Sequence, residues 1–330
     1  MPMGVGRRQF ITALGGATIG WPLAARAQPA GKVAQVGMLY PGVSAVTPTR
    51  IAALREGLRL VHYEDAGRLE ILVRASEGDP ARLPSLAAEL VERKVDAIVA
   101  ISPLAVRAAK AATTAIPIVA NDLESDPVSS GFVASLAHPG GNITGVFSDF
   151  PEFGTKWLEL LKEAIPGLSS VALLWDPATG PTQLEAVKGA GQLLNVGLGV
   201  VEVRAIGDLK GAFAAAGEGK PDAIIILSSP IFGTNPKLIA DLTLQHHVPT
   251  ATLFSEIARA GSLMSYGPNL LGTFQQTGTM LGKVLQGARP ADLPVERPTK
   301  FETVINLKTA KALGLNLPTS ILLRADEVIE

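Results

Sequence analysis

Two stretches of the sequence repeat one pattern, KVDAIVAISP at residues 94–103 and KPDAIIILSSP at residues 220–230. In each, Lys-x-Asp-Ala-Ile opens an apolar run that stops at Ser-Pro, and a helix-like segment and a later Ile-Pro or Val-Pro follow. Such uninterrupted apolar runs are typical of parallel strands that are covered on both faces. We therefore interpret the two stretches as equivalent central strands of two similar α/β lobes. The alternative is that any two buried parallel strands look alike.

The rest of the chain alternates short β-branched runs with runs of helical period, which predicts parallel sheets covered by helices. In the first half, strands are expected at 33–40, 69–73, 97–101, 116–120 and 143–147. Thr47-Pro48 and Asp79-Pro80 each supply an N-cap and a first-turn proline for a helix. In the second half, strands are expected at 171–175, 200–204, 223–227, 250–254 and 262–266. The predicted fold class is α/β, with two doubly wound parallel-sheet lobes and a cleft between them.

The N-terminal residues 1–27 have the features of an export signal. Arg7 and Arg8 precede an apolar stretch at 11–23, and Ala-Arg-Ala at 25–27 supplies an A-x-A cleavage site. The apolar stretch is shorter than the roughly 20 residues that span a bilayer, so a retained anchor is the weaker interpretation. The paired arginines resemble the twin-arginine class of export signal, although an ordinary secretory signal can also begin with two arginines.

Composition narrows the cellular address and the class of partner. The 330 residues carry a formal net charge of -1 and contain no cluster of Lys and Arg interleaved with aromatics, so nucleic acid is not an expected partner. The sequence has no cysteine, which excludes disulfides, thiol catalysis, Cys-bound metal and a lipidated N-terminal Cys. We expect a soluble periplasmic monomer that is not lipid-anchored.

Side chains at the carboxyl ends of the predicted strands are the candidates for ligand contact, because open parallel sheets bind ligands beyond those ends. Two lobes that face one another make a cleft for a small molecule. Hydroxyl, amide, acidic and aromatic groups gather at these positions, which suits a ligand with one flat apolar part and one polar part. The predicted ligand-binding residues are Tyr40, Ser44, Ser102, Pro103, Leu104, Asn121, Asp122, Asp126, Ser148, Trp175, Asp176, Ser228, Ser229, Phe254 and Tyr266.

Several of these candidates have a purely structural alternative. Ser102-Pro103 and Ser228-Ser229-Pro230 can be N-caps with a first-turn proline, a role that also aims backbone N–H groups at an anionic ligand group. The loop at 122–126, with Asp122, Glu124 and Asp126, is either a solvated loop or a source of counter-charge for a ligand amine or a hinge contact. Trp175 is either buried packing or a cleft residue, whereas Tyr266 is expected to face the cleft.

No motif in the sequence predicts catalysis, a metal or a cofactor. His246 and His247 are adjacent, so on a helix they point apart and do not form a metal pair. No G-x-S-x-G elbow, P-loop or G-x-G-x-x-G fingerprint joins a strand to a helix. We therefore expect a protein that is not an enzyme and that holds no cofactor and no metal.

Five segments carry a family resemblance, namely LPSLAAELVERKVDAIVA, KAATTAIPIV, SDPVSSGFVASLAHPGGNITGV, LMSYGPN and PADLPVERPTKFETVINLKTAKALGL. They are similar to the ABC-transporter substrate-binding proteins of the group that includes aromatic-amino-acid binders. The resemblance implies the type I periplasmic binding-protein fold, with residues 32–147 plus 268–298 in lobe 1 and residues 148–267 plus 299–330 in lobe 2. Such proteins close by hinge rotation on a ligand that bridges both lobes, and the closed form docks on ABC permease subunits in the inner membrane.

The resemblance implies the periplasmic solute-binding component of an ABC importer, with an amino acid or an aromatic or branched carboxylate as its small-molecule ligand. Family members often have Gly-Thr-Pro-Ala where this chain has Ser-Pro-Leu-Ala at 102–105, and Trp-Asn-Pro where it has Trp-Asp-Pro at 175–177. Since ligand choice is made at such positions, the identity of the ligand stays open. Two alternatives for the function are a sensory ligand-binding protein and an exported α/β enzyme that acts in the same cleft.

Overall fold

The structure is a computed structural model, and it describes residues 33–63, 69–148 and 152–330. The predicted export signal at 1–27 lies outside the described residues. In the part of the chain that is described, no helix is both long enough and apolar enough to cross a bilayer.

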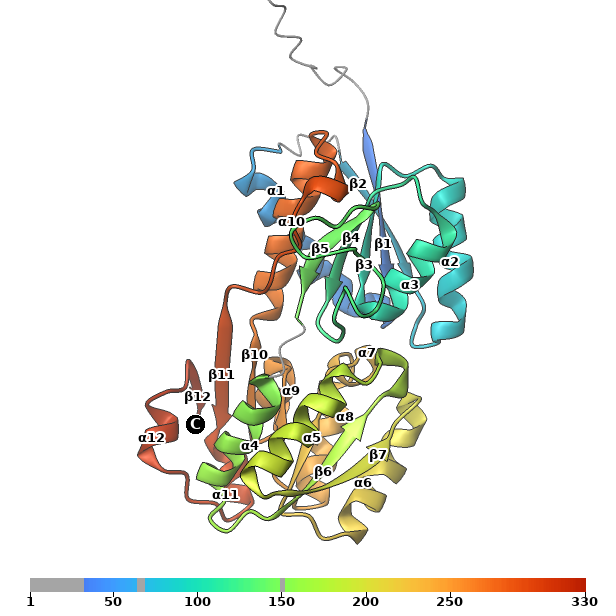
Figure 1. Ribbon diagram of the computed structural model, residues 1–330. Coiled ribbons are helices and arrows are strands. Elements are labelled where there is room, and N and C mark those ends of the chain that lie inside the picture. Colours follow the sequence, from blue (N-terminus) through green and yellow to red (C-terminus); the bar gives the residue numbers. More distant parts are fainter. Residues whose placement is uncertain (1–32, 64–68, 149–151) are drawn as a thin grey trace, which may run out of the picture. The chain divides into compact units, whose positions relative to one another are not determined.

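Five parallel strands form the first sheet, in the order β2-β1-β3-β4-β5 (Figure 1). Its strands are β1 (Ala34–Tyr40), β2 (Leu69–Ala75), β3 (Ala97–Ile101), β4 (Ile118–Asp122) and β5 (Ile143–Phe147). Its helices are α1 (Thr47–Leu60), α2 (Leu83–Glu92), α3 (Ser102–Ala112) and α10 (Leu270–Leu285). Val36 and Met38 of β1 share a core with α1 and α10, whereas Leu39 shares a second core with α2 and α3. Because helices cover both faces, residues 36–40 of β1 are all buried.

Seven strands form the second sheet, in the order β12-β11-β10-β9-β8-β6-β7. They are β6 (Ser170–Trp175), β7 (Gly197–Glu202), β8 (Ala223–Ile226), β9 (Thr250–Thr252), β10 (Met264–Pro268), β11 (Phe301–Asn306) and β12 (Glu327–Ile329). All neighbours are parallel except β10 and β11. The accompanying helices are α4 (Glu152–Ala164), α5 (Thr182–Leu194), α6 (Leu209–Glu218), α7 (Pro230–Gly233), α8 (Pro236–Gln245), α9 (Ser255–Ala260), α11 (Leu307–Ala312) and α12 (Thr319–Leu322).

The two sheets repeat one topology, and this agrees with the internal repeat in the sequence. The order β7-β6-β8-β9-β10 in the second sheet matches β2-β1-β3-β4-β5 in the first, so that β8 corresponds to β3. These are the strands of the repeated Lys-x-Asp-Ala-Ile motif. The predicted α/β fold class is therefore confirmed.

The repeated Lys and Asp have the same structural role in both copies. Lys94 and Lys220 have positive φ angles of 52° and 46°, and each ends a helix-to-strand turn. After each turn, an aspartate accepts a hydrogen bond from the neighbouring strand. Gln35 N of β1 donates to Asp96 at 2.9 Å, and Ser170 N of β6 donates to Asp222 at 2.9 Å. The aspartate of the motif therefore fixes the start of β3 to β1 and the start of β8 to β6.

A few element ends differ from the predicted ones. β4 begins at Ile118, two residues later than predicted, because Pro117 has no N–H to donate to the sheet. Thr47 was expected to cap α1, but it is the first residue of that helix, and its Oγ1 donates to Ser44 O at 2.8 Å. Asp79 does cap its helical turn, since its side chain accepts from Ala81 N at 3.1 Å.

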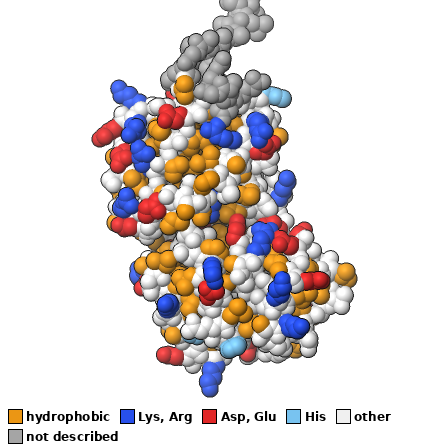
Figure 2. Space-filling model, turned by 180° about the vertical axis from the view of Figure 1, so that it is seen from behind, with side chains coloured by type: hydrophobic (Ala, Val, Ile, Leu, Met, Phe, Trp, Pro, Cys, Tyr) orange, Lys and Arg blue, Asp and Glu red, His pale blue; other side chains and the backbone are white. Residues whose placement is uncertain are grey.

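Charges of both signs are mixed on the surface. On the face shown in Figure 2, Lys and Arg side chains lie among Asp and Glu side chains and form no patch of one sign. Neighbouring charges pair, as Lys188 does with Glu185 at 3.0 Å and Lys237 with Asp241 at 2.9 Å. Exposed pairs of this kind contribute at most about 1 kcal/mol each, so the buried cores stabilise the fold.

The chain crosses between the two sheets three times: between β5 and α4, between β10 and α10, and between α10 and β11. We call the first sheet with α1, α2, α3 and α10 lobe 1, and the second sheet with the remaining helices lobe 2. The residue-level lobe boundaries that the sequence suggested stay a prediction.

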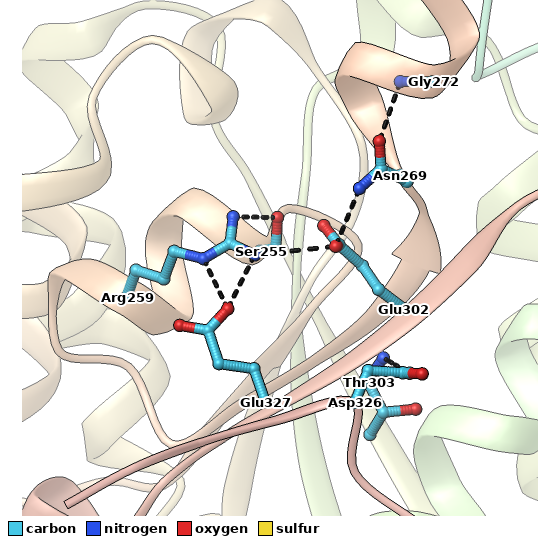
Figure 3. A network of polar contacts seen from close by, with 8 residues as sticks. All are labelled: Ser255, Arg259, Asn269, Gly272, Glu302, Thr303, Asp326 and Glu327. Atoms are coloured by element: carbon cyan, nitrogen blue, oxygen red, sulfur yellow. Dashed lines mark hydrogen bonds and ion pairs between the residues drawn. The ribbon is translucent and has the colours of Figure 1, made fainter.

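Hydrogen bonds tie the second and third crossings to each other (Figure 3). Asn269, which precedes α10, donates from its side chain to Glu302 of β11 at 2.8 Å, and its backbone N donates to Lys300 O at 2.9 Å. The other side-chain atom of Asn269 accepts from Gly272 N at 2.7 Å and so caps α10. Arg259 of α9 then pairs with Glu327 of β12 at 2.8 Å, which ties the last strand to the same network. The two crossings therefore form one hydrogen-bonded unit.

Helices α1 and α10, more than 200 residues apart in sequence, cross at two glycines. A Cβ added at Gly57 would lie 1.8 Å from Gln275 O, and one added at Gly278 would lie 2.0 Å from Leu54 O. Both contacts are with backbone, which cannot turn aside as a flexible side chain can. Any larger residue at either position therefore forces the two helices apart.

We predict that Gly278→Ala destabilises the protein by about 1 to 3 kcal/mol, the usual range for an overpacked core. The midpoint of urea-induced unfolding measures the change. The matched control is Gly189→Ala in α5, where an added Cβ meets nothing within 4 Å. That control should gain up to about 1 kcal/mol, since alanine favours a helix over glycine. If Gly278→Ala and Gly189→Ala shifted the unfolding midpoint equally, α1 and α10 could move apart without loss of stability.

Candidate functional site

A small cavity lies between the lobes and is lined by residues of both. Its volume is about 30 Å³, and its lining is Tyr40, Arg50, Ile101, Ser102, Asn121, Leu123, Glu124, Pro230, Gly233, Phe254, Leu270 and Phe274. This volume holds about one water molecule. A larger ligand enters only if the lobes or the lining side chains move apart.

The carboxyl ends of parallel strands supply much of this lining. Tyr40 ends β1, Ile101 ends β3, and Asn121 is the next-to-last residue of β4, just before the acidic loop at 122–126. From lobe 2, Phe254 follows β9, and α7 follows β8. This is the edge at which open parallel sheets place their ligands. Asn121 also fixes α10, because its side-chain amide donates to Thr273 at 3.2 Å and to Thr277 at 3.0 Å.

Arg50 is the buried cation of the cavity. Arg50 is only 8% exposed. Its guanidinium carbon lies 4.9 Å from the ring centroid of Tyr40 and 5.7 Å from that of Phe274. Burial lowers the pKa of Arg50 to about 10, which the negative charge of Glu256 opposes, so Arg50 remains charged at neutral pH. Among the described residues no hydrogen bond to its guanidinium is formed. Its N–H donors are therefore available to an anionic group in the cavity.

Asp122 and Glu124 place two carboxyl groups in one buried loop. Asp122 is saturated with donors: it accepts from Glu124 N at 2.9 Å, from Ser125 N at 3.1 Å and from Ser125 Oγ at 2.5 Å. Glu124 accepts from Ser228 Oγ at 2.7 Å through Oε1, while its buried Oε2 has no hydrogen-bond partner in the described structure. Oε2 of Glu124 therefore receives no donor in the described structure, and its carboxyl group hydrogen-bonds with that of Asp122 when one of the two carries a proton.

Burial controls the protonation of this pair. It raises the pKa of Asp122 to about 6, against the effect of the donors from Ser125 and Glu124. For Glu124, burial first and the neighbouring Asp122 second raise the pKa well above its ordinary value. Two carboxylates this close in a buried site cannot both ionise at low cost. The pair thus carries a proton on Glu124 under conditions in which an exposed glutamate would be ionised.

Hydrogen bonds cross from the acidic loop to lobe 2. Besides the bond from Ser228 to Glu124, Gln183 of α5 donates its side-chain amide to Leu123 O at 3.2 Å. The same Gln183 accepts from Ser228 N at 2.8 Å. Farther out, Arg107 of α3 donates to Ala178 O at 2.6 Å. The loop at 122–125 is therefore held from both lobes.

Two helix starts border the cavity, but only one of the predicted serine caps is present: Ser229 is the N-cap of α7, whereas Ser102 is the first residue of α3, which has Ile101 at its N-cap position. Ser229 caps α7 by accepting from Ile231 N at 3.1 Å, and its hydroxyl donates to Asp176 at 2.7 Å. Burial raises the pKa of Asp176, which also accepts from Ala178 N. Ser102 begins α3 with a φ of 72°, a left-handed conformation that costs about 1 to 3 kcal/mol in residues other than glycine. The strained residue lies in the cavity wall.

The structure brings only some of the predicted ligand residues into the cavity. Tyr40, Ser102, Asn121 and Phe254 line it, and Asp122 and Ser228 contact Glu124, which lines it too. Ser229 and Pro103 are buried at the starts of α7 and α3. Leu104 and Asp176 line a separate groove of about 90 Å³ between the lobes.

The remaining candidates lie farther away. Ser44 is exposed, and its N–H donates to Glu77. Asp126 accepts from Ser129 N at 2.6 Å, and Ser148 N donates to Asp122 O at 2.8 Å. Trp175 packs against the lobe 2 core, and its indole N–H donates to Gly180 O at 3.1 Å, which supports the packing alternative. Tyr266 lies in another groove with Phe153 and Phe301.

Sequence reasoning missed Arg50 and Phe274, and it did not select Glu124 from the acidic loop. A signal for Arg50 existed, because Arg50, Leu54 and Leu58 are spaced by four residues and share the buried face of α1. A cation on an apolar stripe is unusual and points to a buried partner or ligand. No sequence signal pointed to Phe274, which reaches the cavity only because α10 returns to lobe 1.

A model of the family described as ABC transporter substrate binding protein matches residues 48–329. The chain belongs to this family. A solved domain from Vibrio cholerae is 26% identical with a TM-score of 0.83, covering 90% of this chain and 100% of that chain. A Streptococcus pneumoniae ABC domain in complex with L-Trp is 26% identical with a TM-score of 0.82, covering 90% of this chain and 99% of that one.

A third relative is a tyrosine-binding protein from Clostridioides difficile, 25% identical over 255 residues, which are 77% of this chain and 73% of the relative. Together with the strand order, the solved structures identify the type I periplasmic binding-protein fold. The predicted family and fold are therefore confirmed.

The protonation of Glu124 leads to a prediction about stability. The pKa values of Asp122 and Glu124 are raised in the folded state above the ordinary 3.8 and 4.5, so the native protein binds more protons than the unfolded chain. The free energy of unfolding should then be highest below about pH 4 and fall as pH rises through 6 and above. Glu124→Gln should flatten this decline and raise the melting temperature at pH 8.

Melting temperatures between pH 4 and pH 8 measure this effect, with Glu218→Gln at an exposed position as the control. The control should follow the unmodified protein. Parallel curves for all three proteins would mean that Glu124 is ionised in the folded state without cost.

Proposed function

We propose that this protein is the exported solute-binding component of an ABC importer, and that it closes its two lobes on an amino acid with an aromatic or branched side chain. One observation carries the proposal: a buried cation, Arg50, and a buried acid, Glu124, line the same interlobe cavity. A zwitterionic amino acid supplies a carboxylate for Arg50 and an ammonium that favours the ionised form of Glu124 over its protonated form.

Arg50 and Glu124 each lack hydrogen bonds that a ligand can supply. Arg50 makes no hydrogen bond among the described residues, and Oε2 of Glu124 is buried without a partner. Burying such groups unpaired costs several kcal/mol, whereas pairing them with a ligand recovers much of that cost. A carboxylate on Arg50 and an ammonium on Glu124 satisfy both.

The apolar lining suits the side chain of the ligand. Tyr40, Phe254 and Phe274 present aromatic rings, and Ile101 and Leu270 add aliphatic surface. Aromatic walls with a few fixed polar groups are the usual composition of small-molecule sites. The L-Trp complex and the tyrosine-binding relative support a ligand of this class.

The contacts between the lobes supply a closing mechanism. The ligand binds to lobe 1 first, since Arg50, Glu124 and most of the rings are there. Rotation about the three crossings then brings Phe254 and α7 over it and forms the bonds from Ser228 to Glu124 and from Gln183 to Leu123. Ligand and interlobe bonds together shift the population toward the closed form, which a permease recognises.

The proposed address is the periplasm. Arg7-Arg8 and the Ala-Arg-Ala at 25–27 support export, and the absence of cysteine supports a protein without a lipid anchor. The residues of that signal lie outside the described structure. Delivery to a permease rests on the family to which the chain belongs.

Calorimetric titration with L-tyrosine, L-tryptophan, L-phenylalanine and L-leucine tests the proposal. We expect at least one of them to bind, and its analogues without the amine or without the carboxylate to bind much more weakly. Arg50→Gln and Glu124→Gln should each weaken amino-acid binding by about 1.5 to 3 kcal/mol, the range for a hydrogen bond to a charged group.

Glu124→Gln should spare the amine-free analogue, because that ligand never used the carboxylate. Ser44→Ala serves as the control, since Ser44 is exposed outside the cavity, and it should bind like the unmodified protein. The proposal fails if both cavity variants keep full affinity, or if the amine-free analogue binds as well as the amino acid.

A further inference from the structure

Asp122 and Glu124 form a pair of buried carboxyl groups at the end of β4. Both residues are at most 5% exposed. Three donors reach Asp122, namely the N–H of Glu124 and the N–H and hydroxyl of Ser125. Glu124 receives the hydroxyl of Ser228 on Oε1, and its buried Oε2 receives no donor in the described structure. A proton kept by the pair supplies the missing hydrogen, because one carboxyl group then donates to the other.

The donors divide the roles within the pair. An ionised carboxylate only accepts hydrogen bonds, and Asp122 accepts from three donors, so it suits the ionised member. Glu124, with one oxygen that receives no donor, suits the protonated member. Burial, and after it the charge of Asp122, raises the pKa of Glu124 well above its ordinary value, in agreement with the donor pattern. The two carboxyl groups therefore share one proton.

The surroundings of the pair are mostly neutral. The cavity lining includes the cation Arg50 of α1 and the titratable phenol Tyr40 of β1. Asp126 continues the acidic loop and accepts from Ser129 N, and Glu256 of α9 acts on Arg50. The neutral residues beside the pair come from α5, the segment before α7, α10 and the segment after β5, and they are Gln183, Ser228, Leu270, Phe274 and Ser148. Among the described residues, Arg50 is the one cation in the lining.

A ligand ammonium changes the balance within the pair. It brings a positive charge and three N–H donors to the carboxyl group. A positive charge nearby favours the ionised form of a carboxyl group, so the shared proton leaves as the ammonium arrives. Lobe closure acts in the same direction, because the hydroxyl of Ser228 in lobe 2 donates to Glu124 and such a bond is stronger to a carboxylate. A ligand without an amine brings no such charge, and the proton stays.

We propose that the binding of an amino acid in the interlobe cavity releases the proton that Asp122 and Glu124 share, so that ligand affinity rises with pH. This inference rests on the proposed function, because it takes the ligand ammonium to lie at Glu124. The O–H bond of the carboxyl group breaks, the proton passes to the solvent, and the ammonium takes its place. Because an amine-free carboxylate displaces no proton, the cavity discriminates against such ligands more strongly at higher pH.

Calorimetric titration at pH 6.5 counts the released protons directly. L-Tyrosine, L-tryptophan, L-phenylalanine and L-leucine are each titrated in PIPES and in Bis-Tris buffer, whose different heats of protonation reveal the protons that binding releases. The ammonium and carboxylate of a free amino acid keep their charges at this pH, so the protons come from the protein. We expect about 0.5 to 1 proton per bound amino acid, and an affinity that rises about threefold to tenfold from pH 6 to pH 7.

Matched controls assign the proton to this pair and its release to the amine. Glu124→Gln has no acidic proton at this position, so amino-acid binding to it should release less than about 0.2 proton, and its weaker affinity should change little with pH. Glu218→Gln, at an exposed position, should release as many protons as the unmodified protein. 3-Phenylpropanoate, which is L-phenylalanine without its amine, should bind without proton release.

The outcomes separate this inference from the proposed function. If an amino acid binds without proton release, proton coupling is overturned while the proposed function stands. The same holds if Glu124→Gln releases as many protons as the unmodified protein, or if 3-phenylpropanoate releases as many as L-phenylalanine. If none of the four amino acids binds between pH 6 and pH 8, the proposed function is overturned and this inference with it.

Discussion

The close crossing of α1 and α10 is the contact on which the rest of the structure depends. At Gly57 and Gly278 the two helices approach until a single methyl group would strike backbone. The crossing brings a segment from the last quarter of the chain back to lobe 1, so it requires the second and third passages between the lobes. It also aligns Arg50 of α1 beside Phe274 of α10. The second and third crossings and the interlobe cavity thus both depend on the contact between α1 and α10.

The cavity that results buries a basic and an acidic side chain at a cost to the empty protein. Arg50 is buried against aromatic rings, and Glu124 is buried beside a second carboxyl group. The protein lowers this cost by keeping a proton on the acidic pair and by the bond from Ser228 of lobe 2. Binding sites often retain such unfavourable groups because a ligand with matching charges relieves them. In the proposed mechanism the acidic loop links ligand recognition to lobe closure, since both act on Glu124.

Much of the fold could be predicted from sequence. The repeated Lys-x-Asp-Ala-Ile motif identified two equivalent strands, and the structure gives the reason: a left-handed Lys followed by an Asp that binds the neighbouring strand. The rule that ligands bind beyond the carboxyl ends of parallel strands selected Tyr40, Ser102, Asn121 and Phe254, and all four line the interlobe cavity.

The rest of the site required three-dimensional packing. Phe274 is far from Arg50 in sequence and meets it only through the helix crossing. Tyr266 was expected in the cleft, but successive residues of a strand point to opposite faces, and Tyr266 points toward Phe153 of α4. Trp175 ends its strand as expected, yet its indole turns back to the carbonyl of Gly180. Strand ends can be predicted from sequence more securely than the direction of the side chains that they carry.

A crystal structure with the amino acid that binds most tightly tests the central claim directly. The account predicts the ligand between the lobes, with its carboxylate within about 3.2 Å of the Arg50 guanidinium and its ammonium within the same distance of Glu124. The ring of the ligand should lie among Tyr40, Phe254 and Phe274. A ligand that contacts neither Arg50 nor Glu124, or that lies outside the interlobe cavity, would contradict it.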